Sequence, residues 1–145
     1  MSERPTVPVA ISCAVLRDGA VLLVKRGNEP ARGRWAFPGG RLNPGETLGE
    51  GVAREVMEES GIRIGPPRFV MHHETIGREG ERVTHHFVIC VHAAEPLDDA
   101  RPVAGDDADE ALFVPLQRLD DYDVVPSCIH ALEAIGVLNP ADTEV

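Results

Sequence analysis

Hydrophobic residues dominate two segments near the start of the chain, from Val7 to Leu16 and from Ala20 to Lys25. Both segments are rich in β-branched and aliphatic residues, which favour β-strands. Asp18-Gly19 lies between them and is typical of tight hairpin turns. The pattern therefore predicts that two antiparallel strands open the chain.

A stripe of apolar residues at helical spacing follows a segment rich in Gly, Pro and Arg, RGNEPARGRWAFPGGRLNPGE, which we expect to be a long loop. The stripe consists of Leu48, Val52, Val56 and Met57. Thr47 and Glu50 have the spacing of a capping box, and Gly61 stands where a helix often ends. These signals predict a helix from about Leu48 to Ser60.

The first turn of this expected helix contains two glycines, Gly49 and Gly51. Each of them weakens a helix by roughly 1 kcal/mol relative to Ala. The sequence alone offers no reason for either residue.

Alternating apolar and polar residues return in RFVMHHETI and RVTHHFVICVHAA, which we expect to be two strands joined by a hairpin around GREGE. The acidic segment AGDDADEA then predicts a loop, LFVPL a short strand, and Ser127 the cap of a helix that runs to about Ile135 and stops at Gly136. The chain shows no internal repeat and no linker. We therefore expect a single α+β domain over residues 1–145, with a mixed sheet and two main helices.

Composition limits the classes of function. The 145 residues are 43% hydrophobic and 26% charged, which is ordinary for a globular protein. The net charge of -10 argues against binding to nucleic acid polymers or to an anionic membrane surface, because both require a basic surface. An anionic substrate would have to be met locally, by a metal ion or by a few arginines.

The three cysteines, Cys13, Cys90 and Cys128, are odd in number and far apart, so we expect reduced core residues and no zinc or redox motif. The N-terminal residues lack the apolar core of a signal peptide, and no segment is long enough to span a bilayer. These features predict a cytoplasmic protein without a membrane partner.

Three glutamates crowd one face of the expected helix. Glu55 lies three and four positions before Glu58 and Glu59, and like charges at these spacings destabilise an isolated helix. One interpretation is a divalent cation with oxygen ligands, Mg²⁺ or Mn²⁺, as their counter-charge. The alternative is a solvated acidic face.

A longer motif surrounds these glutamates and fills 23 consecutive residues. Its specified positions are Gly40, Glu46, Arg54, Glu55, Val56, Glu58, Glu59, Gly61 and Ile62. The motif resembles the signature of the Nudix hydrolases, and WAFPGG resembles the segment that usually precedes it. The resemblance implies the α/β/α sandwich of that family.

The resemblance also implies an activity, the metal-dependent hydrolysis of a nucleoside diphosphate linked to another moiety. The resemblance implies that Glu55, Glu58 and Glu59 hold Mg²⁺ or Mn²⁺ together with the backbone carbonyl of Gly40. It also implies that Arg54 orients a catalytic glutamate. A glycine at position 40 would let the backbone approach the metal closely.

The sequence does not identify the general base that activates the water. In some relatives a glutamate of the motif, here Glu55 or Glu58, activates the water. In others an acidic residue of a later loop does so, and Asp106, Asp107 and Glu110 are the candidates in this chain.

Four histidines, His72, His73, His85 and His86, lie on the two strands of the expected hairpin. A zinc site lacks a specifying ligand spacing, which leaves substrate contact or plain sheet-surface positions as the other interpretations. Trp35 and Phe37 are expected in the core or the wall of a pocket, with base stacking as the alternative.

The substrate that the resemblance favours is ADP-ribose or a related nucleotide sugar. A nucleoside triphosphate pyrophosphohydrolase of the house-cleaning type is one alternative. A nucleotide-sensing module that has lost turnover is another, although the intact glutamates argue against it. The expected partner is a small nucleotide, and the family also allows a homodimer.

Overall fold

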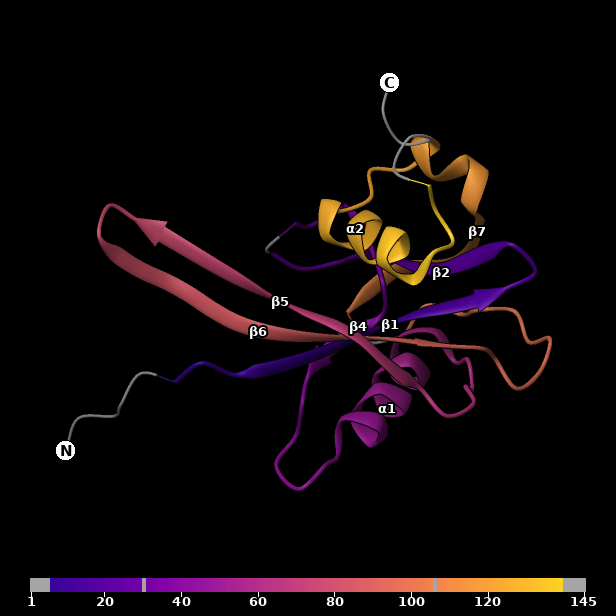
Figure 1. The fold of residues 1–145 in the computed structure, drawn as a ribbon, viewed down its shortest axis with the longest axis horizontal. Coiled ribbons are helices and arrows are strands. Elements are labelled where there is room, and N and C mark those ends of the chain that lie inside the picture. Colours follow the sequence, from indigo (N-terminus) through magenta and orange to yellow (C-terminus); the bar gives the residue numbers. More distant parts are fainter. Residues whose placement is uncertain (1–5, 30, 106, 140–145) are drawn as a thin grey trace.

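The computed structural model describes residues 6–29, 31–105 and 107–139. Two helices, α1 (Leu48–Ser60) and α2 (Pro126–Ile135), cover opposite faces of a β-sheet, as Figure 1 shows. This arrangement confirms the predicted sandwich of a mixed sheet between helices. Among the described residues, no helix is long and apolar enough to cross a membrane.

The sheet contains parallel and antiparallel pairs. Its strands are β1 (Val9–Arg17), β2 (Ala20–Arg26), β3 (Trp35–Ala36), β4 (Gly39–Arg41), β5 (Arg68–Glu79), β6 (Arg82–Ala94) and β7 (Ala108–Pro115). They follow the order β3-β2-β1-β6-β5, while β4 pairs with β1 and β7 with β2. Among the strand pairs of the described residues, β1 with β6 is the parallel one and the others are antiparallel, so the sheet is mixed.

The predicted opening hairpin forms, but its strands separate at once. Asp18 and Gly19 have φ angles of 50° and 76° in the turn. Only two registered pairs, Leu16 with Val21 and Arg17 with Ala20, join the strands beyond the turn. β1 then pairs with β6 and β4, whereas β2 pairs with β7 and β3. The segment expected to be one long loop therefore contributes two short strands, β3 and β4.

Two apolar clusters fill the space between the sheet and the helices, because successive residues of a strand face opposite sides. The cluster on the α2 side includes Val21, Leu23, Trp35, Phe37 and Leu132. The cluster on the α1 side includes Ile11, Cys13, Leu22, Val52 and Val56. Trp35 and Phe37 thus belong to the core.

Helix α1 has the predicted bounds, and both of its ends are capped as expected. Thr47 Oγ1 accepts from the Glu50 amide at 3.2 Å, and Glu50 Oε1 accepts from the Thr47 amide at 2.9 Å. Gly61 ends the helix with φ 71°. The prediction for Met57 is wrong, because its side chain is 41% exposed and the apolar stripe is narrower than expected.

The structure explains one of the two glycines in the first turn of α1. A Cβ atom on Gly51 would lie 2.6 Å from Ile11 Cδ1 and 2.8 Å from Leu42 Cδ1. A Cβ atom on Gly49 would meet only Pro67 Cγ, at an ordinary 3.7 Å. Gly51 therefore allows α1 to pack closely on the sheet, while nothing in the structure explains Gly49.

Three further boundaries differ from the prediction. Ser127 is not the cap of α2: the N-cap is Val125, without a side-chain bond, and Pro126 occupies the first turn, where its fixed φ suits a helix. A 3₁₀ helix, Leu116–Asp121, precedes α2. Strand β7 starts at Ala108, inside the segment expected to be a loop. Gly136 ends α2 as predicted, with φ 92°.

The cysteines are free, in line with the prediction. Cys13 and Cys128 are buried, and burial raises the pKa of each thiol to about 12. Cys90 is half-buried, and burial raises its pKa as well. A high thiol pKa keeps the reactive thiolate scarce, which fits core residues.

Candidate active site

Arg54 connects the loop before α1 to the acidic face of the helix. Its Nε donates to Glu46 Oε2 at 2.6 Å and its Nη2 donates to Glu46 Oε1 at 2.9 Å. Nη1 donates to Glu55 Oε1 at 2.7 Å and to Glu58 Oε2 at 3.2 Å. Nη2 also donates to the carbonyl of Arg41 at 2.9 Å. One guanidinium thus fixes two carboxylates of α1 relative to the preceding loop.

The pKa values follow these contacts. The hydrogen bond from Arg54 lowers the pKa of Glu46, and the Asn43 amide, which donates to Glu46 Oε1 at 2.8 Å, lowers it further. The hydrogen bonds to Glu46 and Glu55 raise the pKa of Arg54 despite its partial burial. Both groups therefore stay charged at neutral pH. Part of the counter-charge for the acidic face is Arg54 itself.

Glu59 has different surroundings from the other two glutamates. Its Oε1 accepts from the Gly39 amide at 2.7 Å. Burial raises the pKa of Glu59 to about 7, and the negative charges of Glu55 and Asp107 act in the same direction. The Gly39 hydrogen bond and the charge of Arg26 only partly oppose this rise. The site around Glu59 is therefore short of positive charge.

Gly40 lies directly against the side chain of Glu55. A Cβ atom on Gly40 would lie 2.7 Å from the carboxyl atoms of Glu55, so any larger residue would displace that carboxylate. Strand β4 holds Gly40 in place because Gly40 is registered with Ile11 of β1. The backbone of β4 and the acidic face of α1 thus border the same space.

That space is a pocket of about 400 Å³. Its lining residues come from the end of β2, from β4, from α1 and from the acidic loop before β7: Arg26, Gly27, Asn28, Glu29, Gly39, Gly40, Arg41, Glu55, Glu58, Glu59 and Asp107. The lining thus contains carboxylates that can hold cations and arginines that can meet an anion.

The acidic loop is tied to the end of α1 and to the loop after β2. The Gly105 amide donates to the carbonyl of Glu59 at 3.1 Å, and the Gly27 amide donates to the carbonyl of Asp107 at 2.9 Å. Asp107 is thereby held in the pocket lining. Glu110 lies on β7, where it forms an ion pair with Lys25 at 3.5 Å, and it is not among the lining residues. Asp106 lies outside the described residues.

The model of the NUDIX domain family matches residues 6–132. The chain belongs to the Nudix family. This confirms the resemblance that the motif from Gly40 to Ile62 carries, and we call that motif the Nudix box from here on.

Individual Nudix relatives agree with this assignment. The chain is 34% identical over 113 residues to an ADP-ribose pyrophosphatase of Methanocaldococcus jannaschii, covering 77% of this chain and 63% of that protein. It is 39% identical over 70 residues to the phosphatase NudJ of Escherichia coli, covering 47% and 44% of the two chains. The matches thus span less than two thirds of the length of these curated relatives. The crystal structure of a MutT NUDIX hydrolase from Burkholderia pseudomallei superposes with a TM-score of 0.76 at 25% identity, covering 90% and 99% of the two chains.

The metal ligands expected from the Nudix box line one pocket, but their carboxylates are not gathered around a single point. In the described part of the chain, no three His, Cys, Asp or Glu side chains form a group that could hold a metal ion. Arg54 binds Glu55 and Glu58, while the Gly39 amide binds Glu59. The donors are nevertheless all oxygens, which suits Mg²⁺ or Mn²⁺. The raised pKa of Glu59 also indicates a site that a cation would stabilise.

Several residues that line the pocket were not predicted from the sequence. Arg26, Asn28 and Glu29 come from the end of β2 and the loop after it, far from the Nudix box in sequence. Arg41 directly follows Gly40 in the box, and its guanidinium lies 5.3 Å from the ring centroid of Phe87 on β6. The position of Arg41 within the box was the one signal that could have found it.

The four histidines do not form a cluster. The register of β5 and β6 pairs His72 with Cys90 and Gly77 with His85. The ring of His85 covers Gly77, where a Cβ atom would collide with it. His86 lies 3.9 Å from Glu74 and is registered with Ile76. None of the four histidines lines the pocket, so the sheet-surface interpretation fits best.

Proposed function

We propose that this protein hydrolyses the pyrophosphate bond of a nucleoside diphosphate linked to another moiety, with Mg²⁺ or Mn²⁺ as cofactor. The observation that carries the proposal is the pocket that unites the carboxylates of α1, the backbone at Gly40 and the side chains of Arg26 and Arg41. The carboxylates supply ligands for a cation, and the two arginines supply positive charge for phosphate oxygens.

Glu55, Glu58, Glu59 and the carbonyl of Gly40 are the proposed metal ligands. A bound divalent cation would neutralise phosphate oxygens and lower the pKa of a water molecule. Arg54 holds Glu55 and Glu58 at the pocket, and these carboxylates would have to converge with Glu59 when a cation binds. Arg54 acts on the reaction through these carboxylates, because its guanidinium donates to protein oxygens of Glu46, Glu55, Glu58 and Arg41.

The water also needs a proton acceptor. Glu55 and Glu58 remain candidates from the Nudix box. Asp107 and Glu110 are the two later candidates among the described residues, and the position of Asp107 in the pocket lining supports it as the base. The Gly27 amide donates to its backbone carbonyl at 2.9 Å and ties this residue to the loop after β2.

ADP-ribose, or a related nucleotide sugar, is the substrate we propose. The relative that is named ADP-ribose pyrophosphatase shares 34% identity over 113 residues with this chain, a stretch that includes more than the Nudix box alone. Arg41 and Phe87 offer a flat cationic and aromatic wall next to the pocket, on which a base or ribose can pack.

A substrate panel tests the proposal. The protein is incubated with Mg²⁺ and, separately, ADP-ribose, a uridine nucleotide sugar and nucleoside triphosphates, and the products are separated by ion-exchange chromatography. We expect AMP and ribose 5-phosphate from ADP-ribose. Pyrophosphate released from a triphosphate, with ADP-ribose untouched, would favour the house-cleaning alternative. Nucleotide binding without any product would favour the sensing module.

A further inference from the structure

The chain between β6 and β7 crosses the C-terminal end of α1. The last carbonyls of a helix have no partner within the helix, and two amides of this segment bind them from outside. The Val103 amide donates to the carbonyl of Ser60 at 2.9 Å, and the Gly105 amide donates to the carbonyl of Glu59 at 3.1 Å. The acidic loop is therefore seated on the end of the helix that carries the proposed metal ligands.

Gly105 fits this seat because it has no side chain. A Cβ atom at this position would lie 2.5 Å from the carbonyl oxygen of Glu58, well inside the contact distance of carbon and oxygen. The obstacle is the backbone of the helix, which cannot turn aside as the end of a long side chain can. A larger residue at position 105 must therefore lift the loop from the helix.

A tight turn joins Gly105 to Asp107. The Ala108 amide donates to the carbonyl of Gly105 at 3.1 Å, and Asp107 lies within this turn. Asp107 also meets a second glycine, Gly27, whose amide donates to the carbonyl of Asp107 at 2.9 Å. A Cβ atom on Gly27 would lie 2.7 Å from the same oxygen. The backbone of Asp107 is thus tied to α1 through Gly105 and to the loop after β2 through Gly27.

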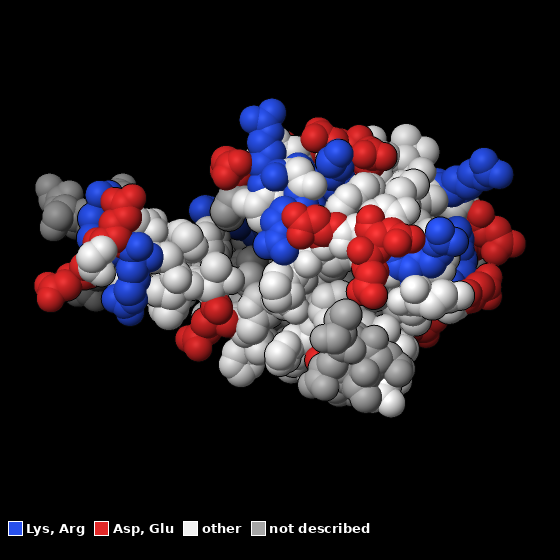
Figure 2. Space-filling view, turned by 90° about the horizontal axis from the view of Figure 1, so that it is seen from above, with Lys and Arg blue, Asp and Glu red and all other residues white. Residues whose placement is uncertain are grey.

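Charge alone does not hold Asp107 in this place. The negative charges of Glu55 and Asp107 both raise the pKa of Glu59, so these carboxylates repel one another. Figure 2 shows acidic and basic side chains interspersed over one face of the protein, so their fields partly cancel at a distance. The backbone contacts therefore hold the acidic loop against repulsion, and their loss would let Asp107 move away from the glutamates.

We propose that Gly105 is a positioning residue, whose seat on α1 fixes Asp107 relative to Glu58 and Glu59. The inference rests on the proposed function, in which Asp107 accepts the proton of the attacking water. Gly105 is not among the residues that line the pocket, so it acts on the reaction through Asp107.

A double-mutant cycle tests this role. Gly105→Ala adds the colliding methyl group, and Asp107→Asn removes the carboxylate that Gly105 positions. Gly65→Ala is the matched control, because the Gly65 amide also donates to a backbone carbonyl, that of Glu95 at 2.9 Å. A Cβ atom on Gly65 would lie at an ordinary 3.7 Å from that oxygen. The values of kcat and KM are measured for the parent, the single variants and the double variant, with the substrate that the panel identifies.

We expect Gly105→Ala to lower kcat about tenfold or more with little change in KM, and Gly65→Ala to match the parent. In the Asp107→Asn background Gly105→Ala should cost little more, because both changes take the same group from its place. Equal losses with and without the Asp107 carboxylate would overturn the proposal. Thermal melts show whether each variant folds. If Gly105→Ala does not fold, Gly27→Ala enters the same cycle, since its methyl group meets the carbonyl of Asp107.

Amide hydrogen exchange, followed by NMR, tests the seating of the loop without any activity. The Gly27 amide is protected by the carbonyl of Asp107, so lifting the loop at position 105 should expose it. We expect its exchange to be about tenfold or more faster in Gly105→Ala than in the parent and in Gly65→Ala. Unchanged exchange at Gly27 would overturn the proposal whether or not the protein is a hydrolase. A parent that hydrolyses nothing would instead refute the proposed function and, with it, the catalytic role of Asp107.

Discussion

Arg54 of α1 and Glu46 of the preceding loop form a bidentate ion pair within the Nudix box, with nitrogen–oxygen distances of 2.6 Å and 2.9 Å. Side chains from a loop and from a helix are thereby joined in one fixed geometry, which a bidentate guanidinium favours. The remaining guanidinium nitrogen is directed to Glu55 and Glu58. The crowded negative charge on α1 is therefore ordered by an arginine from the same helix.

Arg54→Ala should lower kcat much more than it raises KM, because Arg54 positions the ligand carboxylates and binds no substrate in this geometry. Residues that orient metal ligands typically contribute about 10- to 100-fold to activity. Steady-state kinetics on the parent and the variant would measure the split. Arg118→Ala is the control, since Arg118 pairs with Asp121 in the 3₁₀ helix and does not line the pocket. A change confined to KM would instead make Arg54 a substrate ligand.

Glu59→Gln should make the metal-free protein less sensitive to pH. Burial raises the pKa of Glu59 to about 7, above its ordinary value of 4.5. The folded state therefore binds this proton more tightly than the unfolded state, so the parent loses stability as pH rises from below 4.5 to above 7. Below both values Glu59 makes no difference. Thermal melts in a chelator at pH 5 and pH 8 should show a larger fall for the parent than for the variant.

The same pair of proteins reports on metal binding. A cation that binds only the folded site stabilises it by roughly 2.7 kcal/mol at a hundred times its dissociation constant. We expect the parent to gain this stability in Mg²⁺ and Glu59→Gln to gain much less, at matched ionic strength. Equal Mg²⁺ shifts in the two proteins would remove Glu59 from the set of ligands.

Gly49→Ala and Gly51→Ala should differ in stability although both change the first turn of α1. Replacement of a helical glycine by alanine typically gains up to about 1 kcal/mol. Gly49 has room for the new methyl group, whereas at Gly51 the methyl group must displace Ile11 and Leu42. Denaturant unfolding should therefore rank Gly49→Ala above Gly51→Ala. The opposite order would mean that the close contact of α1 with Ile11 is unimportant.

Asp107→Asn should slow turnover, and Glu110→Gln should not. Asp107 lines the pocket, while Glu110 forms its ion pair with Lys25 outside it. Loss of a general base typically costs about 10²- to 10⁴-fold in rate. If both variants keep full kcat, the base must be sought among the glutamates of the Nudix box.

Local signals in the sequence predicted the local structure. The capping box and Gly61 predicted both ends of α1. The spacing of the glutamates in the Nudix box predicted that they share one face of this helix. The prediction for Met57 is wrong because helical spacing does not reveal how wide the buried face of a helix is. The prediction for Ser127 is wrong because Pro126 occupies the first turn of α2, and the preference of serine for the cap position does not reveal this.

Contacts between segments that lie far apart in the chain could not be predicted from the sequence. The early separation of β1 and β2 depends on their pairing with β6 and β7, which lie far along the chain. For the same reason Arg26 was not predicted in the pocket, since it arrives there from the end of β2. The length over which β5 and β6 extend as a pair likewise depends on where β1 stops pairing with β6.

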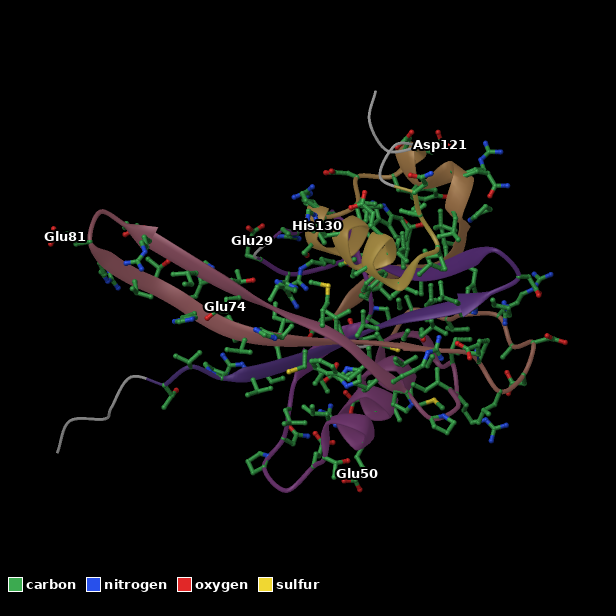
Figure 3. All side chains as sticks on the ribbon, viewed as in Figure 1. Glu29, Glu50, Glu74, Glu81, Asp121 and His130 are labelled. Carbon is green, nitrogen blue, oxygen red and sulfur yellow. The ribbon has the colours of Figure 1, made fainter. Side chains whose placement is uncertain are left out.

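We propose that the carboxylates of the pocket carry out metal-dependent cleavage of a pyrophosphate. Glu58→Gln and Glu50→Gln each remove one negative charge from α1, but Glu58 lines the pocket and Glu50 belongs to the capping box, which glutamine preserves. Figure 3 places Glu50 at the start of α1, well apart from Glu29 of the pocket lining.

The most direct measurement is the rate of AMP release from ADP-ribose by the parent and these two variants, in Mg²⁺ and after chelation. We expect AMP release by the parent and by Glu50→Gln in Mg²⁺, and a rate lower by about 100-fold or more in Glu58→Gln. After chelation we expect no AMP release from any of the three proteins. Release that survives chelation, or an equal loss in the two variants, would contradict the proposal.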